Sequence, residues 1–559
     1  MMKRHLANLA IIVAFVLLVA ALPTYAGAAD SDFEIKNGVL IRYHGTNGTV
    51  NVPSTVTAIG DYAFSKSSFV SNVILPASVK TIGSYAFNEC AVLKSVNIGS
   101  GVTEIGANAF YSCYYLKDIN IPGNVKTIGP GAFANCYSIS DLKLGDGLVS
   151  LGPRAFSMCI GLTAFNVPAN LTSIGNGAFA GCVNLEKYTV SDKNTAFAAF
   201  DGVLYSKDGK TLVAYPQARE GAYTLRAGTT TVAGGAFSYA TKLTGLAGTQ
   251  SLEMVGVSAF ESCSLLRDIY LPKAQLINDY AFYNCVALKT ARVGSANLGK
   301  YAFAECAALN TVIISDGAWF INDFAFGWCS MLTNLVLPSS IQLIGNNIFS
   351  YSPKNTKVLC EPGSIPHKYF TTVEPPVACA PLPAPSDWAV APLKAADRFA
   401  VANLQIGYKE NATRREFALA VANFLEQYYN KGIDALVAER NLKIGAFSDT
   451  DDKDILAVNA LGIINGTGEG KFSPDSLLTR EQAAALMYRV MEMLKIDTSD
   501  VPEAQYRDAN KISDWAKAAV NVMTELGIMR GDGTNFNPGQ QCTREMCIIM
   551  FARLWEAVN

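Results

Sequence analysis

VKTIGSYAFNECAVLKSVNI, residues 79–98, contains the pattern that decides the fold of this chain. It combines an Ile-Gly pair, an Ala-Phe pair, a cysteine three residues after the phenylalanine, and a Leu-x-x-Val-x-Ile run. Twelve copies of one short unit indicate a solenoid, in which each unit buries its apolar face against its neighbours. The repeated phenylalanines, 23 residues apart from the first to the sixth, are Phe64, Phe87, Phe110, Phe133, Phe156, Phe179, Phe237, Phe260, Phe282, Phe303, Phe326 and, in a degenerate copy, Phe349.

The unit has two halves. Leu93, Val96 and Ile98 show the L-x-x-L-x-L spacing of a leucine-rich repeat strand, with alternation at its end. The Gly-x-x-Ala-Phe-x-x-Cys half, with apolar residues three or four apart, predicts a turn of helix on the opposite side. The units resemble the 23-residue, BspA-like class of leucine-rich repeats found in bacterial surface proteins. The resemblance implies an α/β leucine-rich repeat solenoid at residues 53–360, with short parallel strands, one per coil.

The composition and the start of the chain indicate export. The chain has 559 residues, a net charge of −2 and 16% charged residues, so no bulk charge attracts it to nucleic acid or to an anionic membrane. Residues 1–28 have a basic start, an apolar centre and a small-residue finish. This order is typical of a secretory signal peptide, with a retained membrane anchor as the alternative. No later segment reaches the ~18 apolar residues of a membrane span, so no transmembrane segment is expected after signal cleavage.

Two β-hairpins are predicted to accompany the coils. In the first, at residues 29–52, GVLIRY and TVNV flank the pair Asn47-Gly48 and cap the open edge of the first coil. The second is an insert at about residues 190–224, which we expect to lie on the solenoid edge as a structural element. The alternative for the insert is a binding role for Tyr205 and Tyr215 as exposed aromatic residues.

Nine of the 13 cysteines occupy one position of the repeat, three residues after the phenylalanine. Because coils stack at roughly the strand spacing of ~4.8 Å, these side chains are predicted to form a buried row of apolar thiols. Disulfides between neighbours and a metal site are the alternatives. An odd number of one-per-coil cysteines pairs poorly, and the chain has no Cys-x-x-Cys and only 3 histidines. Cys360 and Cys379 are a further candidate pair. The row comprises Cys90, Cys113, Cys136, Cys159, Cys182, Cys263, Cys285, Cys306 and Cys329.

A candidate ligand surface lies at the outward-facing strand position, between the last two apolar residues of each run. The early coils place polar residues there, namely Asn97, Asn120, Lys143 and Asn166, and the late coils place Tyr270, Arg292, Ile313 and Val336. Clustered exposed aromatic residues mark contact surfaces for a protein or a glycan. We therefore predict a ligand patch on the late coils, with packing against the following cap as the alternative. Its residues are Tyr270, Arg292, Trp319, Phe320 and Trp328.

After a proline-rich cap and linker at residues 361–385, the pattern becomes helical and a second repeat begins. Three helix starts share Thr-Arg, at Thr413, Thr479 and Thr543. The first two carry Glu or Gln three residues after the threonine, which predicts a capping box, and Met546 breaks it in the third. The second and third starts follow the glycine-rich segments LGIINGTGEGKFSP and LGIMRGDGTNFNP.

These features, together with two Trp-Ala pairs, resemble three S-layer homology modules, at residues 386–432 (degenerate), 445–494 and 506–554. The resemblance implies a pseudo-threefold helical bundle whose grooves bind secondary cell-wall polysaccharide carrying acidic groups, often pyruvate ketals. By position it implies anion contacts from the arginines, since a guanidinium at a helix N-terminus suits a carboxylate, and a sugar-stacking surface from the tryptophans. The residues are Arg414, Arg480, Arg544, Trp388 and Trp515.

The sequence departs from the S-layer homology pattern in two of the modules. The first lacks the glycine-rich loop, having only Gln405-Ile406-Gly407-Tyr408 before its Thr-Arg pair, and the second has FSDTDDKDIL where the others have tryptophan. We therefore do not expect all three grooves to bind. The acidic run of the second module is expected to be a solvated loop. Calcium binding is the alternative, although the glycine and glutamate of an EF-hand loop are absent.

The sequence thus predicts a secreted, non-enzymatic protein of the bacterial cell wall or S-layer. Its solenoid binds an unknown host or bacterial protein or glycan, as an adhesin or receptor does, and its helical modules anchor it to wall polysaccharide. The alternative is a structural envelope component whose solenoid self-associates. No Ser/His/Asp or Cys/His set, carboxylate pair or phosphate loop is evident, so no catalytic residue, metal or cofactor is expected.

Overall fold

The computed structural model describes residues 29–353, 355–372, 379–381, 384–396, 407–429, 431–498 and 500–558. The predicted signal peptide and part of the proline-rich linker lie outside the described residues. The chain forms two compact units. The first ends at Ala178 and includes Ser191–Thr195, and the second comprises Phe179–Val190 and Ala196–Asn559.

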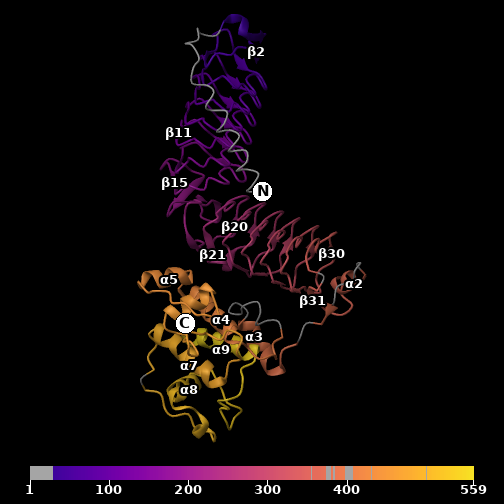
Figure 1. The fold of residues 1–559 in the computed structure, drawn as a ribbon, viewed down its shortest axis with the longest axis vertical. Coiled ribbons are helices and arrows are strands. Elements are labelled where there is room, and N and C mark those ends of the chain that lie inside the picture. Colours follow the sequence, from indigo (N-terminus) through magenta and orange to yellow (C-terminus); the bar gives the residue numbers. More distant parts are fainter. Residues whose placement is uncertain are drawn as a thin grey trace. The chain divides into compact units, whose positions relative to one another are not determined.

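The first unit is a parallel β-solenoid, as predicted, in which successive coils stack strand on strand (Figure 1). Each coil contributes one strand to each of two sheets, so a coil has two strands and not one. One sheet has the order β1 (Phe33–Lys36), β2 (Val39–Tyr43), β4 (Ala58–Ile59), β6 (Thr81–Ile82), β8 (Glu104–Ile105), β10 (Thr127–Ile128), β12 (Ser150–Leu151) and β14 (Ser173–Ile174). The other contains β3 (Thr49–Asn51), β5 (Asn72–Ile74), β7 (Ser95–Asn97), β9 (Asp118–Ile121) and β11 (Asp141–Leu144), and β13 spans Ala164–Val167.

The second unit continues the same architecture with its own sheets. The larger sheet has the order β16 (Phe197–Phe200), β17 (Val203–Ser206), β18 (Thr211–Ala214), β20 (Thr231–Val232), β22 (Met254–Val255), β24 (Leu276–Ile277), β26 (Asn297–Leu298), β28 (Phe320–Ile321) and β30 (Leu343–Ile344). The facing sheet contains β23 (Asp268–Leu271), β25 (Thr290–Val293), β27 (Thr311–Ile314), β29 (Asn334–Val336), β31 (Lys357–Leu359) and β32 (Cys379–Ala380). The remaining strands are β15 (Lys187–Val190), β19 (Gly221–Thr224) and β21 (Leu243–Ala247).

The Ala-Phe half of the coil does not form the predicted turn of helix. It forms successive tight turns, and no α-helix is found among residues 29–353 of the described chain. The cause is visible at Tyr85 and Glu89, which flank Ala86-Phe87 and have φ values of 57° and 57°. A left-handed residue on each side of the pair ends any right-handed helix there. The apolar spacing of three or four residues arises from this turn geometry.

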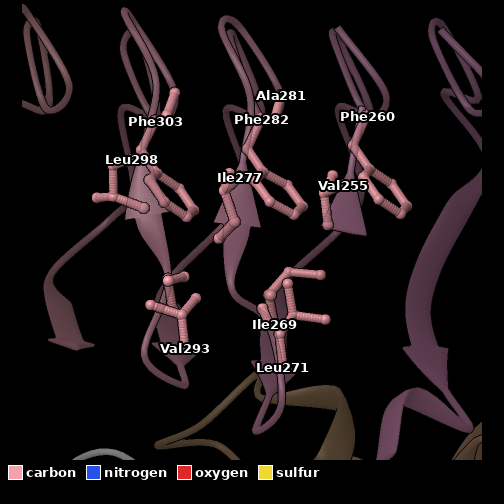
Figure 2. Packing of buried hydrophobic residues seen from close by; sticks show 14 of the residues in the cluster. Val255, Phe260, Ile269, Leu271, Ile277, Ala281, Phe282, Val293, Leu298 and Phe303 are labelled. Carbon is pink, nitrogen blue, oxygen red and sulfur yellow. The ribbon is translucent and has the colours of Figure 1, made fainter. Parts of the chain in front are cut away.

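A stack of phenylalanine rings forms the centre of the solenoid in each unit. Phe87, Phe110 and Phe133 are buried, and their ring centroids lie 4.9 and 5.0 Å apart with nearly parallel planes. Figure 2 shows the same packing in the second unit, where Phe260, Phe282 and Phe303 repeat beside Val255, Ile277 and Leu298. Each ring is covered by its equivalents on the neighbouring coils, which explains why the residue is repeated so strictly.

The row of cysteines is buried, and all of its members are free thiols. The thiols also donate hydrogen bonds along the stack: Cys113 Sγ lies 3.1 Å from the Phe87 carbonyl oxygen of the preceding coil. In two coils without the cysteine, another side chain donates. Ser352 Oγ donates to the Phe326 carbonyl at 2.7 Å. The buried Gln217 amide donates to the Phe179 carbonyl at 3.0 Å. In most coils this side chain therefore satisfies a buried carbonyl as well as filling apolar space, whereas Ala240 has no side-chain donor.

The strand pairing predicted for the N-terminal hairpin is wrong. The antiparallel pair is β1 with β2, joined at Asn37-Gly38, while β3 pairs in parallel with β5 in the opposite sheet. Asn37 and Gly38 have φ values of 51° and 77°, as a two-residue hairpin turn requires. The segment around Asn47-Gly48 instead connects the two sheets.

The insert is also placed differently from the prediction. Its strands β16, β17 and β18 pair antiparallel, and β18 then pairs in parallel with β20, so the insert heads the larger sheet of the second unit. Tyr205 and Tyr215 are fully buried, and they are not available as exposed binding residues. An antiparallel hairpin thus begins the main sheet of both units, where it covers the first parallel edge.

The end of the solenoid is covered by the proline-rich segment. Helix α2 (Ile365–Thr372) follows β31, and β32 then adds to the sheet beside β31. Ile313, Val336 and Leu359 form a small apolar cluster with Ala380 of β32. Cap packing therefore accounts for the apolar outward positions of the late coils. Cys360 and Cys379 are both free, so the suggested pair is not formed.

The helical region has one apolar core, to which Phe417, Phe424 and Phe551 contribute. Its elements are η3 (Asp387–Ala389), α3 (Val390–Ala396), α4 (Arg414–Tyr429), α5 (Ile433–Glu439), α6 (Lys453–Ala460), α7 (Arg480–Met493), η6 (Ala509–Lys511), η7 (Asp514–Ala516), α8 (Lys517–Glu525) and α9 (Arg544–Val558). No helix among the described residues is long and apolar enough to cross a membrane.

Candidate functional site

The three Thr-Arg helix starts begin α4, α7 and α9. Thr479 and Gln482 form the predicted capping box at the start of α7. At α4, Thr413 Oγ1 accepts from the Glu416 backbone NH at 3.2 Å, and the Glu416 carboxylate accepts from the Thr413 backbone NH at 2.9 Å. At α9 only the threonine side of the box is formed, through the Met546 backbone NH. The caps fix the residue at which each helix begins, so each arginine is the first residue of its helix.

Two of the arginines hold the glycine-rich loop of the next module. Arg414 donates from Nε to the Phe472 carbonyl at 3.0 Å and from Nη2 to the Asn465 carbonyl at 2.9 Å. Its guanidinium carbon lies 4.9 Å from the centroid of the Phe472 ring. Burial lowers the pKa of Arg414 from its ordinary value. The arginine of the first module thus stabilises the loop of the second by charge-assisted hydrogen bonds.

Arg480 repeats this arrangement between the second and third modules. It donates to the Phe536 carbonyl at 2.8 Å and to the Arg530 carbonyl at 2.9 Å, and its guanidinium carbon lies 4.8 Å from the centroid of the Phe536 ring. Arg480 is only 7% exposed. Its charge is therefore directed mainly at backbone oxygens.

Arg544 closes the ring of modules with different chemistry, because the first module has no glycine-rich loop to receive it. Its Nη2 lies 2.8 Å from Glu416 Oε1, and its Nη1 pairs with Glu410. Two carboxylates thus hold the Arg544 guanidinium among the described residues. The three contacts run from module one to two, from two to three, and from three to one, which is the cyclic arrangement implied by the resemblance.

The two exposed tryptophans stand beside a second intermodule contact. The backbone NH of Ser513, which precedes η7, donates to Glu481 at 3.0 Å. The backbone NH of Ser386, which precedes η3, donates to Glu545 at 2.9 Å. These contacts hold Trp515, 58% exposed, and Trp388, 52% exposed, next to the helix start of the preceding module in the ring.

The spacing of Thr-Arg did not predict this second contact, but the sequence carries a signal for it. The helix starts that face a Ser-Asp-Trp-Ala motif read Thr-Arg-Glu, whereas α4 faces the tryptophan-less second module and has Arg415 in place of the glutamate. Arg415 lies 3.6 Å from Asp475. The glutamate and the tryptophan motif are therefore present or absent together.

The acidic run of the second module has structural roles. Asp449 accepts from the backbone NH groups of Phe472 and Ser473, both at 2.8 Å, and these bonds lower the pKa of its carboxyl. Asp508 holds the third loop in the same way. Asp452 caps α6. No group of three metal-ligating side chains occurs in the part of the chain that the structure describes.

The five residues predicted for the solenoid patch fall into three groups. Tyr270 and Arg292 are strand neighbours in register, as predicted, but Arg292 is only 5% exposed and lies over the Tyr270 ring. Trp319 is exposed and packs edge-on against Phe320. Trp328 is exposed in the Ala-Phe turn and stacks between Phe324 and Tyr351.

The last group belongs to a longer aromatic row that was not predicted. Tyr280, Tyr301 and Phe324 each precede an Ala-Phe pair, and their neighbouring ring centroids lie 5.0 Å apart. Trp328 and Tyr351 continue the series. The signal in the sequence is the residue before Ala-Phe, which is aromatic in three successive coils.

Comparison with known proteins agrees with both repeats. The family model for the BspA type leucine rich repeat region matches residues 43–146, 80–200 and 230–356. The chain belongs to the BspA-type leucine-rich repeat family. The S-layer homology domain model matches residues 448–484 and 505–545 of this BspA-type protein, which lie in its second and third modules.

The curated relatives include S-layer proteins and glycanases. The S-layer protein sap of Bacillus anthracis is 34% identical over 92 residues, which are 16% of this chain and 11% of that protein. An endoglucanase of Bacillus sp. (strain KSM-635) is 35% identical over 111 residues, 19% of this chain and 12% of the enzyme. The chain thus spans only a small part of the relatives it matches. Because the glycanase alignments fall in the S-layer homology region, they bring no catalytic residues to this chain.

Solved structures match the solenoid. The pneumococcal vaccine antigen PcpA aligns with a TM-score of 0.51 at 22% identity, covering 62% of this chain and 92% of that one. A leucine rich cell surface protein of Faecalibacterium prausnitzii aligns at 27% identity with a TM-score of 0.46, covering 62% of this chain and 98% of that one. Leucine-rich repeats and S-layer homology modules are non-enzymatic surface or structural domains. The S-layer homology modules and the S-layer relatives indicate a cell-surface, cell-wall-associated protein.

Proposed function

We propose that the helical modules bind acidic secondary cell-wall polysaccharide and that the solenoid presents a recognition surface to a macromolecular ligand, as in an adhesin. The observation that carries the proposal is the pair of exposed tryptophans, each held at an intermodule contact next to a Thr-Arg-Glu helix start. An exposed indole suits the apolar face of a sugar ring, and nearby cations suit its acidic substituents.

The contact between α7 and the third module is the main polysaccharide site in this proposal. It alone among the three described contacts combines Arg480, Glu481, a glycine-rich loop and Trp515. The contact between α9 and the first module has Trp388 but no such loop, and the contact between α4 and the second module has no tryptophan. Arg530 is exposed on the third loop, where its cation is available to an acidic sugar substituent.

The test is co-sedimentation of the full mature chain with purified cell-wall sacculi, before and after acid removal of the wall polysaccharide. The wild type is expected to pellet only with intact polysaccharide. Trp515→Ala should weaken pelleting more than Trp388→Ala, and the double variant should abolish it. Trp319→Ala is the matched control, because it removes an equally exposed indole from the solenoid. Pelleting that is independent of the polysaccharide, or equal for all variants, would reject the proposal.

The second candidate function is a structural envelope component whose solenoid self-associates. The exposed aromatic row that ends at Trp328 and Tyr351 favours it, since such rows commonly bury their edges against a partner. Sedimentation velocity of the full chain distinguishes the two functions. Concentration-dependent assembly that Trp328→Ala with Tyr351→Ala removes would support the structural role, and a monomer at all concentrations would exclude it.

A further inference from the structure

A shallow groove crosses the turn edge of the first unit, and its volume is about 590 Å³. This is within the 300–1,000 Å³ range of sites for small ligands. One wall consists of the residues that precede the Ala-Phe pairs, and the other consists of residues one or two positions after the phenylalanines. The lining residues are Tyr62, Ser65, Lys66, Tyr85, Asn88, Glu89, Asn108 and Tyr111.

The walls are built from residues that the backbone does not favour. Five of the lining residues are in the left-handed region, with φ between 53° and 62°, namely Tyr62, Lys66, Tyr85, Glu89 and Asn108. This conformation costs a residue with a Cβ about 1–2 kcal/mol, and glycine avoids the cost. Some later coils place glycine at equivalent positions, as at Gly131, Gly177 and Gly181, and others keep a left-handed side-chain residue there, as at Arg154.

Fold stability does not explain the choice of large side chains in the groove. Tyr62 is 54% exposed, and the Lys66 and Glu89 side chains are exposed too. The turn of the repeat imposes this backbone conformation in most coils, so the exposed aromatic and polar side chains of the groove, and not the backbone strain alone, indicate a function. The groove ends where the glycines begin, so the side chains themselves create it.

The lining combines aromatic rings with neutral hydrogen-bonding groups. The rings of Tyr62 and Tyr85 stack with centroids 5.0 Å apart and planes 4° from parallel. Asn88 is 7% exposed, and its amide nitrogen lies 3.2 Å from Glu89 Oε1. Lys66 pairs with Glu89 at 3.8 Å, so the ammonium and the carboxylate compensate each other.

We propose that this groove binds a neutral glycan. The aromatic wall suits the apolar face of a sugar ring, and the amides, carboxylate and ammonium suit its hydroxyl groups as donors and acceptors. Paired charges disfavour an ionic ligand, which distinguishes this groove from the proposed site for acidic polysaccharide at the helical modules. The inference rests on the proposed function, since it names the ligand class and the place at which the solenoid recognises it.

The test is binding of the full mature chain to a printed array of neutral oligosaccharides ending in hexose, N-acetylhexosamine or fucose. The double variant Tyr62→Gly with Tyr85→Gly removes the aromatic wall and suits the left-handed backbone, so its melting temperature should equal or exceed that of the wild type. Tyr280→Gly with Tyr301→Gly is the matched control, because those tyrosines have φ of 57° and 55° at the same repeat position in the second unit.

The proposal predicts that the wild type and the control retain the same glycans, and that the groove variant binds them at least about 10-fold more weakly, as expected when aromatic contacts at the centre of a site are removed. Retention of the glycans by the groove variant, equal loss in both variants, or no neutral glycan bound by the wild type would each overturn it. Sacculus co-sedimentation is measured on the same variants. If all variants co-sediment like the wild type while the wild type binds no neutral glycan, or while the groove variant retains its glycans, the groove assignment is wrong and the anchoring proposal stands.

Discussion

The solenoid and the helical region are both built from repeats, but they join their repeats in different ways. In the solenoid, most coils meet the next through a phenylalanine ring and a thiol-to-carbonyl hydrogen bond at the same repeat positions. In the helical region, three modules close a ring, and the third contact uses carboxylates where the first two use loop carbonyls, among the described residues. A linear stack repeats one contact along its length, whereas the ring has a different contact at its third position.

The largest expected effect is the loss of one ring from the stack. Phe110→Ala should lower the free energy of unfolding of its coils by about 4 kcal/mol, because it leaves a cavity between two buried rings. Urea unfolding followed by circular dichroism measures this. Tyr115→Ala removes an exposed ring five residues later in the same coil and should have an effect below about 0.5 kcal/mol. A loss under about 1 kcal/mol for Phe110→Ala would show that the coils do not depend on the stack.

The next effect tests the carbonyl-holding arginine. Arg480→Ala should destabilise the helical region by about 3 kcal/mol, because two carbonyls lose a charged donor in a buried place. Arg480→Lys should not rescue it, since an ammonium cannot reproduce the guanidinium fork. Arg415→Ala removes a more exposed arginine at the start of α4 and is the control. Thermal unfolding of the three variants gives the result, and equal stability of Arg480→Ala and Arg415→Ala would contradict the account.

The carboxylate contact is expected to be somewhat less sensitive. Glu416→Gln should lower stability by about 2 kcal/mol, because the half-buried Arg544 loses one of its two carboxylate partners, the buried one, while the amide still accepts one hydrogen bond. The control is Glu439→Gln, which breaks the exposed pair with Lys431 and should change stability by less than about 0.5 kcal/mol. If the two substitutions are equivalent in thermal unfolding, the third contact is not an essential closure of the ring.

The smallest effect is expected in the cysteine row. Cys136→Ser should cost under about 1 kcal/mol, since the hydroxyl can donate to the Phe110 carbonyl as the thiol does, and Ser352 already does so in the last coil. Cys136→Ala, which removes the donor, should cost more than Cys136→Ser. Burial raises the pKa of the Cys136 thiol well above its ordinary value, so iodoacetamide at pH 8 should modify it only after unfolding. Rapid modification of the native protein would contradict the buried row.

Much of this architecture was predictable because it depends on repeated residues. The period of Ala-Phe is sufficient to predict a stack of coils, and the spacing of Leu93, Val96 and Ile98 is sufficient to predict a strand. The second strand of each coil was not predictable, because pairs such as Thr81-Ile82 are too short to show alternation. The left-handed residues around Ala-Phe were not predicted, because tyrosine and glutamate rarely adopt a positive φ, whereas glycine often does.

The candidate sites show the same limit. The Thr-Arg starts were sufficient to locate the intermodule contacts. They did not show that Arg414 and Arg480 direct their charge at loop carbonyls, because each loop lies more than 50 positions away in the sequence. Arg292 occupies the predicted strand register, yet its burial depends on tertiary packing that no local pattern contains. Local repeats predict register well, and exposure less well.

The central proposal is that the helical region, and not the solenoid, binds the cell wall, and separate fragments test it most directly. A chain ending at Ala384 and a chain beginning at Ser386 are mixed with purified sacculi after circular dichroism has confirmed that each is folded. The account predicts that the fragment from Ser386 onward pellets with sacculi that retain their polysaccharide, while the solenoid fragment stays in solution. A solenoid fragment that pellets as well as the helical fragment would contradict it.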